Sequence, residues 1–250
     1  LLGLVLAKER PKLVQFIAIP LAFSFLIRPT NALPIVAFTI YIVWNYREYI
    51  WKYLAWAALI TVPFFLYNLS LYGSLLSPYY LPHEQLGEAS PYEFNFWDGF
   101  FGLLISPGRG LFIYTPLFLL SFLGAWLGYR KTRDLLFIII PLLFLVYWLV
   151  LSSFGDWWGG HSYGPRYFTE LSPLFIFLLI PLLQIQFERW NWKRIALTTA
   201  LTLTTLISFA MHLRGATDLE SRDWNREPTD INESRERLWD WEDPPFLRGL

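Results

Sequence analysis

Seven long apolar stretches that contain no Asp, Glu, Lys or Arg limit what this chain can fold into. Crossing about 30 Å of hydrocarbon takes roughly 20 helical residues, and an uncompensated charge at mid-bilayer is costly. The stretches therefore predict an all-α, polytopic membrane protein. The predicted spans cover residues 13–27, 32–46, 53–72, 110–128, 135–153, 171–187 and 195–213. The first two are short, so a pair that crosses only part of the bilayer stays an alternative.

The composition supports a membrane location over a soluble one. Hydrophobic residues make up 55% of the 250 residues and charged residues only 16%, whereas soluble domains carry about 25% charged residues. A net charge of zero gives no indication of a nucleic-acid partner. The chain has no cysteine, which excludes disulfides and thiolate metal sites. The apolar segment Leu1–Ala7 is typical of the last turns of a truncated span, so we expect the true N-terminus to lie upstream.

Basic residues lie in alternate connections, and this arrangement predicts the orientation of the spans. Eleven Lys and Arg residues occupy the connections near residues 8–12, 47–52, 130–133 and 189–194, which the positive-inside rule places on the cytoplasmic side. The extracytoplasmic side then holds loops 28–31, 73–109 and 154–170 and a tail over residues 214–250. We expect a transmembrane domain over residues 1–213 and a small extracytoplasmic tail over residues 214–250.

Three isolated arginines on the predicted outer side stand beside proline or glycine. Arg28 precedes Pro29, Arg109 lies within Ser106–Gly110, and Arg166 follows Pro165. Proline restricts the backbone and glycine lets it approach a ligand closely, while a guanidinium donates paired hydrogen bonds to phosphate. For each arginine alone, snorkelling or helix capping is an equal alternative. Together, they predict an anion-binding site for a donor phosphate.

The loop that follows the fifth predicted span carries most of the remaining polar chemistry. Asp156, Trp158, His161 and Tyr163 are the predicted contacts to a sugar or an acceptor, because aromatic rings stack on sugars and polar side chains bond to hydroxyls. An aromatic belt at the membrane surface is the structural alternative for the tryptophans. A single histidine without a second ligand at metal spacing predicts no protein-built metal site.

Two further segments contain weaker candidates. The segment Gly73–Ser106 is partly amphipathic and is predicted to include a short surface helix, with Glu84 and Asp98 as weak catalytic candidates.

The tail has six basic and ten acidic residues and no apolar run. Asp230 and Glu233 have the spacing of a capping box, which predicts a short helix to about Trp241.

These motifs, taken in chain order, resemble the C-terminal part of GT-C superfamily membrane glycosyltransferases, in particular the polyprenyl-phosphate-dependent group related to protein O-mannosyltransferases and aminoarabinose transferases. The resemblance rests on the sequences FLIRPT at 25–30, YNLSLYGS at 67–74, ISPGRGL at 105–111, WWGGHSYGPRY at 157–167 and RLWDW at 237–241. It extends through nearly the whole chain.

The resemblance implies a multi-pass enzyme of the bacterial cytoplasmic membrane that transfers a sugar to an acceptor on the extracytoplasmic side. The donor would be a polyprenyl-phosphate sugar, with no built-in cofactor, and the acceptor a saccharide, lipid or protein. Members of this group carry the general base in the first outer loop, so the resemblance implies that this carboxylate lies upstream of Leu1. Arg109 and Arg166, and less directly Arg28, would contact the donor phosphate.

Two other classes of membrane protein use outward-facing cationic loops. A transporter or flippase of lipid-linked saccharides would be expected to show repeated segments or charges within its spans, and the sequence shows neither. A surface-polysaccharide ligase stays an alternative, as does a non-catalytic relative.

Overall fold

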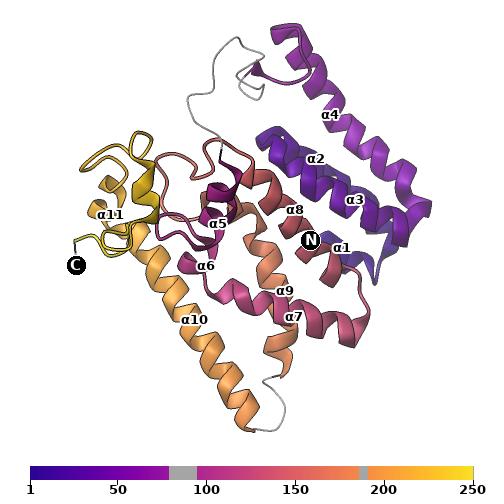
Figure 1. The fold of residues 1–250 in the computed structure, drawn as a ribbon. Coiled ribbons are helices and arrows are strands. Elements are labelled where there is room, and N and C mark those ends of the chain that lie inside the picture. Colours follow the sequence, from indigo (N-terminus) through magenta and orange to yellow (C-terminus); the bar gives the residue numbers. More distant parts are fainter. Residues whose placement is uncertain (79–94, 186–190, 250) are drawn as a thin grey trace. The chain divides into compact units, whose positions relative to one another are not determined.

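The computed structural model describes residues 1–78, 95–185 and 191–249, and the ribbon drawing shows these parts as helices and connecting turns (Figure 1). Helices form most of the described residues, which include no strand. The predicted all-α class is therefore confirmed. The chain divides into two compact units, Leu1–Pro91 and Tyr92–Leu250, each of which is described by itself.

The first unit consists of helices joined by tight 3-10 turns. Its α-helices are α1 (Leu2–Ala7), α2 (Ala18–Ile27), α3 (Ala32–Tyr46) and α4 (Ile50–Tyr72), with 3-10 segments at Pro11–Ile17, Pro29–Asn31 and Arg47–Tyr49. Helices α2 and α4 pack together, and Phe25 meets Phe64 and Phe65 edge-on at their contact. Helix α4 ends at Gly73, whose φ of 66° suits a residue without a side chain.

The second unit contains the remaining elements. They are α5 (Phe96–Ile105), α6 (Leu111–Tyr114), α7 (Leu117–Thr132), α8 (Leu136–Ser152), a 3-10 segment at Arg166–Leu171, α9 (Ser172–Ile185), α10 (Trp192–Thr217), α11 (Leu219–Asp223) and a 3-10 segment at Arg235–Trp239. Helix α5 is a short helix within Gly73–Ser106, whereas its predicted position along the membrane surface stays a prediction. The rest of that prediction lies mostly on residues 79–94, outside the described residues.

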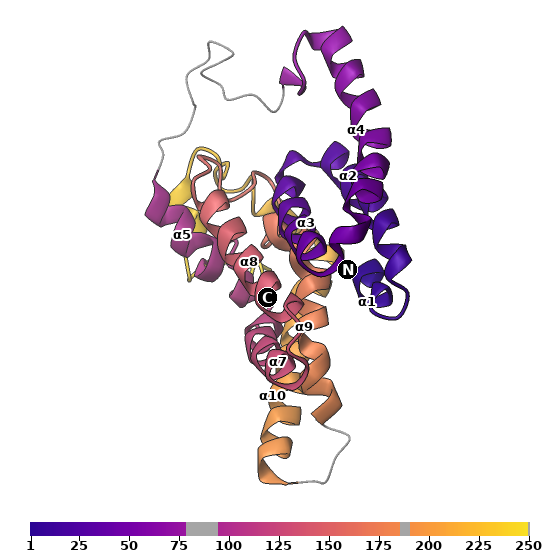
Figure 2. The same ribbon diagram turned by 90° about the vertical axis from the view of Figure 1, so that its right-hand side faces the viewer.

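Close packing between α7 and α9 forms the centre of the second unit, and these helices lie side by side in both ribbon views (Figures 1 and 2). Phe118 and Phe175 stack with their ring centroids 4.6 Å apart. The hydroxyl of Ser121 donates to the carbonyl of Phe175 at 3.0 Å. At Gly124, an added Cβ would lie 1.9 Å from the carbonyl oxygen of Leu178, so this contact requires glycine.

Three helical stretches among the described residues are long and apolar enough to cross a membrane: Pro29–Tyr72, Arg166–Gln184 and Trp192–Thr217. The first includes both α3 and α4. Shorter apolar helices at Pro11–Ile27 and Leu136–Ser152 coincide with two further predicted spans. The structure thus supports a membrane protein, whereas the count of seven spans and their orientation stay predictions.

The predicted span 110–128 is interrupted rather than continuous. Helix α6 stops at Tyr114, Thr115 has φ −135°, and α7 begins after Pro116. The residue before a proline is sterically disfavoured in the helical conformation, which explains the break at Thr115.

The residues that follow α10, from 218 to 249, form the C-terminal segment, and they fold against loops of the second unit. Helix α10 runs to Thr217, beyond the predicted boundary between residues 213 and 214. Trp224, Ile231 and Leu238 of the C-terminal segment are fully buried. Asp230 and Glu233 begin a turn, but the predicted helix is only the 3-10 segment Arg235–Trp239.

Candidate functional site

The turn Ser106–Gly110 between α5 and α6 holds Arg109 in a fixed position. The hydroxyl of Ser106 accepts a hydrogen bond from the backbone N–H of Arg109 at 2.9 Å, and the carbonyl of Ser106 accepts from Gly110 at 2.7 Å. The N–H of Gly108 donates to the carbonyl of Leu238 at 3.1 Å, which ties the turn to the C-terminal segment.

The guanidinium of Arg109 lies in the interior, with only 1% of the residue exposed. It donates to the carbonyls of Gly108 at 2.8 Å, Trp158 at 2.9 Å and Gly160 at 3.0 Å, and to Oδ1 of Asn225 at 2.6 Å. Burial lowers the pKa of Arg109 to about 10, which leaves the side chain charged at neutral pH. Protein acceptors thus take four of its five N–H donors, and a direct phosphate contact by Arg109 stays a prediction.

Arg166 approaches the same backbone stretch from the exposed side. Its Nη1 donates to the carbonyl of Gly159 at 3.3 Å, between the two carbonyls that Arg109 contacts. Gly159 and Gly160 have φ values of 71° and 63°, so the turn needs two consecutive glycines to present these carbonyls. The structure therefore brings Arg109 and Arg166 to one turn. Arg28 lies in the first unit, at the end of α2.

The predicted sugar-contacting residues of loop 154–165 make contacts with protein. The indole N–H of Trp158 donates to Asn232 at 3.0 Å, and the guanidinium of Arg235 covers its ring at 5.4 Å. Trp158 is 1% exposed, so its ring faces no solvent in this conformation. The carboxylate of Asp156 accepts a weaker bond from the hydroxyl of Tyr167 at 3.3 Å.

His161 and Tyr163 of the same loop lie closer to open space. His161 Nε2 lies 2.9 Å from the carboxylate of Asp230, and this contact lowers the pKa of Asp230. The hydroxyl of Tyr163 donates to the carbonyl of Met211 at 2.9 Å. Burial raises the pKa of Tyr163 to about 12, so the phenol is neutral at physiological pH.

Asp98 at the start of α5 connects two distant tryptophans. Its carboxylate accepts hydrogen bonds from the indole of Trp157 at 2.9 Å and from that of Trp239 at 2.6 Å. These bonds give Asp98 a structural role at the junction of α5, loop 154–165 and the C-terminal segment. The other weak candidate, Glu84, lies outside the described residues.

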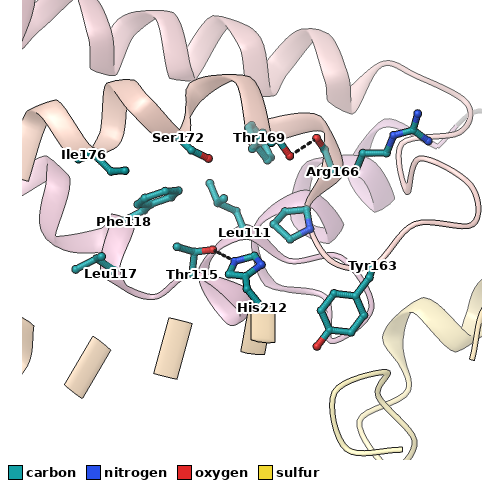
Figure 3. A pocket seen from close by; sticks show the side chains of 12 residues that line it. Leu111, Thr115, Leu117, Phe118, Tyr163, Arg166, Thr169, Ser172, Ile176 and His212 are labelled. Atoms are coloured by element: carbon teal, nitrogen blue, oxygen red, sulfur yellow. Dashed lines mark hydrogen bonds between the residues drawn. The ribbon is translucent and has the colours of Figure 1, made fainter. Parts of the chain in front are cut away.

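Two neighbouring cavities of opposite character share Tyr163 as part of their walls. The apolar cavity, of about 390 Å³, lies between the N-terminal turns of α7 and α9 and the C-terminal part of α10, and Figure 3 shows its lining. The polar cavity, of about 310 Å³, lies between loop 154–165 and the C-terminal segment. Its lining is His161, Ser162, Tyr163, Gly215, Arg222, Asp223, Asn225 and Arg226.

The apolar cavity has a small polar edge. Thr115 and His212 are hydrogen-bonded to each other at 2.8 Å, as the dashed line in Figure 3 marks. The guanidinium of Arg166 points away from this cavity, although the residue contributes to its wall (Figure 3). The cavity therefore suits a hydrocarbon chain with a polar group at one end.

Arg222 and Arg226 are the residues that the sequence analysis missed. Both are exposed, and the side chain of Arg222 makes no ion pair with any residue that the structure describes. Their spacing of four residues within an acidic tail was the available signal, but the net charge of the tail masked it. A pair of exposed guanidiniums beside Asn225 can bind an anion.

No cluster of three or more His, Asp or Glu suited to a metal ion occurs within residues 1–78, 95–185 and 191–249. The predicted absence of a metal site stays a prediction. Comparison with protein-family models finds no match to this chain. The curated proteins and the solved structures likewise give no match, so the functional argument rests on the residues and their geometry.

Proposed function

We propose that this chain is part of a membrane glycosyltransferase that takes its sugar from a polyprenyl-phosphate carrier at the extracytoplasmic surface. One observation carries the proposal: an apolar cavity and a cationic polar cavity share the wall formed by Tyr163. A polyprenyl-phosphate sugar has the matching parts, a hydrocarbon chain followed by an anionic phosphate and a hydroxyl-rich ring.

The apolar cavity would hold the first isoprenoid units of the carrier. Leu111, Phe118 and Ile176 line it, and burying each methylene group contributes about 0.8 kcal/mol. The cavity lies at the ends of α7, α9 and α10, which are predicted to face the outer side. A carrier in that leaflet could enter it without leaving the bilayer.

The polar cavity would hold the phosphate and the sugar. Arg222 and Arg226 supply two positive charges, of which Arg226 also interacts electrostatically with Asp230. Asn225 adds an amide whose Oδ1 accepts a hydrogen bond from Arg109. When the glycosidic bond breaks, its electron pair goes to the phosphate oxygen, and cations placed there stabilise the developing charge. Arg109 and Arg166 support the turn that forms the opposite wall.

The test measures binding of undecaprenyl phosphate to the chain in lipid nanodiscs. Replacing Arg222 or Arg226 by Ala is expected to weaken binding about 10- to 100-fold each, because a hydrogen bond to a charged group contributes about 1.5–3 kcal/mol. Arg130→Ala and Arg133→Ala, at the C-terminal end of α7, are the matched controls and should leave the affinity unchanged. Equal affinities for all four variants would contradict the phosphate site.

A second assay separates transfer from transport. The full-length protein is supplied with a panel of polyprenyl-phosphate hexoses, and release of polyprenyl phosphate is measured together with movement of the intact donor across the membrane. Release supports the transferase. Movement of the intact donor without release would favour the flippase alternative.

A further inference from the structure

His161 is held at the mouth of the polar cavity by a carboxylate from a distant part of the chain. Its Nε2 lies 2.9 Å from both oxygens of Asp230, and Asn232 Nδ2 lies farther away, at 3.3 Å. Asp230 is itself positioned by the backbone N–H of Asn232 at 2.9 Å, and the indole of Trp158 holds the side chain of Asn232 at 3.0 Å.

This contact determines which imidazole nitrogen is basic. A neutral imidazole carries one proton, and a carboxylate beside Nε2 favours the tautomer with the proton on Nε2. The lone pair then lies on Nδ1, which has no hydrogen-bond partner among the residues that the structure describes. The His161 side chain is 37% exposed and forms part of the wall of the polar cavity, where an acceptor hydroxyl would approach it.

Charged and polar groups from two segments surround this imidazole. Arg222, Asp223, Arg226 and Tyr163 line the same cavity, and Asp230 is the carboxylate on the side of the C-terminal segment. A carboxylate that orients a histidine and stabilises its protonated form is a recurring arrangement for general bases.

We propose that His161, oriented by Asp230, is the general base that removes the proton from the acceptor hydroxyl during sugar transfer. The inference rests on the proposed function and places a base within this chain, in contrast to the upstream carboxylate that the family resemblance implies. The acceptor oxygen forms a bond to the anomeric carbon as the bond from that carbon to the phosphate oxygen breaks. The electron pair leaves with the phosphate, the acceptor proton moves to Nδ1, and Asp230 stabilises the imidazolium.

The kinetic test compares His161→Gln and Asp230→Asn with Glu233→Gln, an exposed residue of the same segment, in the full-length protein. General-base catalysis contributes about 10²–10⁴-fold in rate, so His161→Gln should lower kcat by that factor while retaining its affinity for undecaprenyl phosphate. Asp230→Asn should lower kcat less, and Glu233→Gln should match the wild type.

Two results would overturn the inference. They are an unchanged kcat in His161→Gln and a loss of activity matched by an equal loss of undecaprenyl phosphate binding. The ¹⁵N chemical shifts of the imidazole of His161 give a readout that does not depend on turnover, because they distinguish the two tautomers. A proton on Nδ1 in the wild-type protein at neutral pH would reject the base even if the phosphate site is real, whereas a proton on Nε2 supports it.

Discussion

Replacing Arg109 by Ala should destabilise the second unit by about 3–5 kcal/mol, because several buried hydrogen bonds to a charged group, each contributing about 1.5–3 kcal/mol, are lost at once. The substitution removes the guanidinium donor from the carbonyls of Trp158 and Gly160, which keep hydrogen bonds from Ser162, and leaves the amide oxygen of Asn225 without a donor. Each buried acceptor without a partner costs about 1–3 kcal/mol. We expect this loss of hydrogen bonds to exceed the free energy gained by no longer burying a charge. The guanidinium joins loop 154–165 to the C-terminal segment, so its removal weakens the contact between them.

Unfolding of the chain in detergent micelles, followed by tryptophan fluorescence, measures this effect. Limited proteolysis of the C-terminal segment reports the same loss locally, because this segment should open first. Arg109→Lys keeps the charge but not the planar fork, so its stability should fall between that of the Ala variant and the wild type. Arg166→Ala is the control, since its exposed guanidinium makes one bond of 3.3 Å, and it should change stability by less than about 1 kcal/mol. Wild-type stability in Arg109→Ala would show that the buried guanidinium does not hold these segments.

The second large effect is expected at Gly124, where α7 touches the backbone of α9. A methyl group there would lie 1.9 Å from the carbonyl oxygen of Leu178, and backbone atoms cannot rotate aside. Gly124→Ala should therefore separate the helices and destabilise the second unit by about 3 kcal/mol, the upper part of the range for overpacked interiors. Small residues at helix contacts have this role in membranes generally, because they let backbones approach closely.

Gly128→Ala is a matched control one helical turn further along α7. Its Cβ would meet the ring of Phe137 at 2.4 Å, and a ring at the end of a side chain can move. Both substitutions raise the intrinsic helix propensity by the same amount, about 1 kcal/mol, so their difference in unfolding free energy isolates the backbone clash. Equal stabilities of the two variants would mean that α7 and α9 do not approach as closely as described.

The sequence predicted the helices well where hydrophobic length determines them. Helix α3 spans Ala32–Tyr46, as expected, whereas α10 extends the predicted range to Trp192–Thr217. The extension at its start follows from Asn191, whose side chain accepts from the N–H of Arg194 at 3.1 Å and caps the helix. The sequence also contains the cause of the interruption at Thr115, which is the following residue, Pro116.

The arrangement of the candidate site could not be predicted in the same way. Burial of Arg109 depends on carbonyls of loop 154–165 and on Asn225, and periodicity within one helix carries no information about such distant partners. The excess of acidic over basic residues in the tail predicted a separate appendage. Net charge sums over all residues of the tail, so it does not show which of them face a cavity and which are buried. Arg222 and Arg226 face the polar cavity, whereas Trp224 between them is buried.

The long sequence separation of these contacts has a consequence for biogenesis. Asp98 bonds to Trp239 and Arg109 to Asn225, across 141 and 116 residues. A ribosome synthesises α5 and the turn Ser106–Gly110 well before it reaches the C-terminal residues that they contact. Until Asn225 has been added to the chain, the guanidinium of Arg109 lacks this acceptor and is expected to stay hydrated. A nascent chain arrested before Trp224 would expose the turn at Ser106–Gly110 to quality-control proteases, whatever the state of its inserted helices.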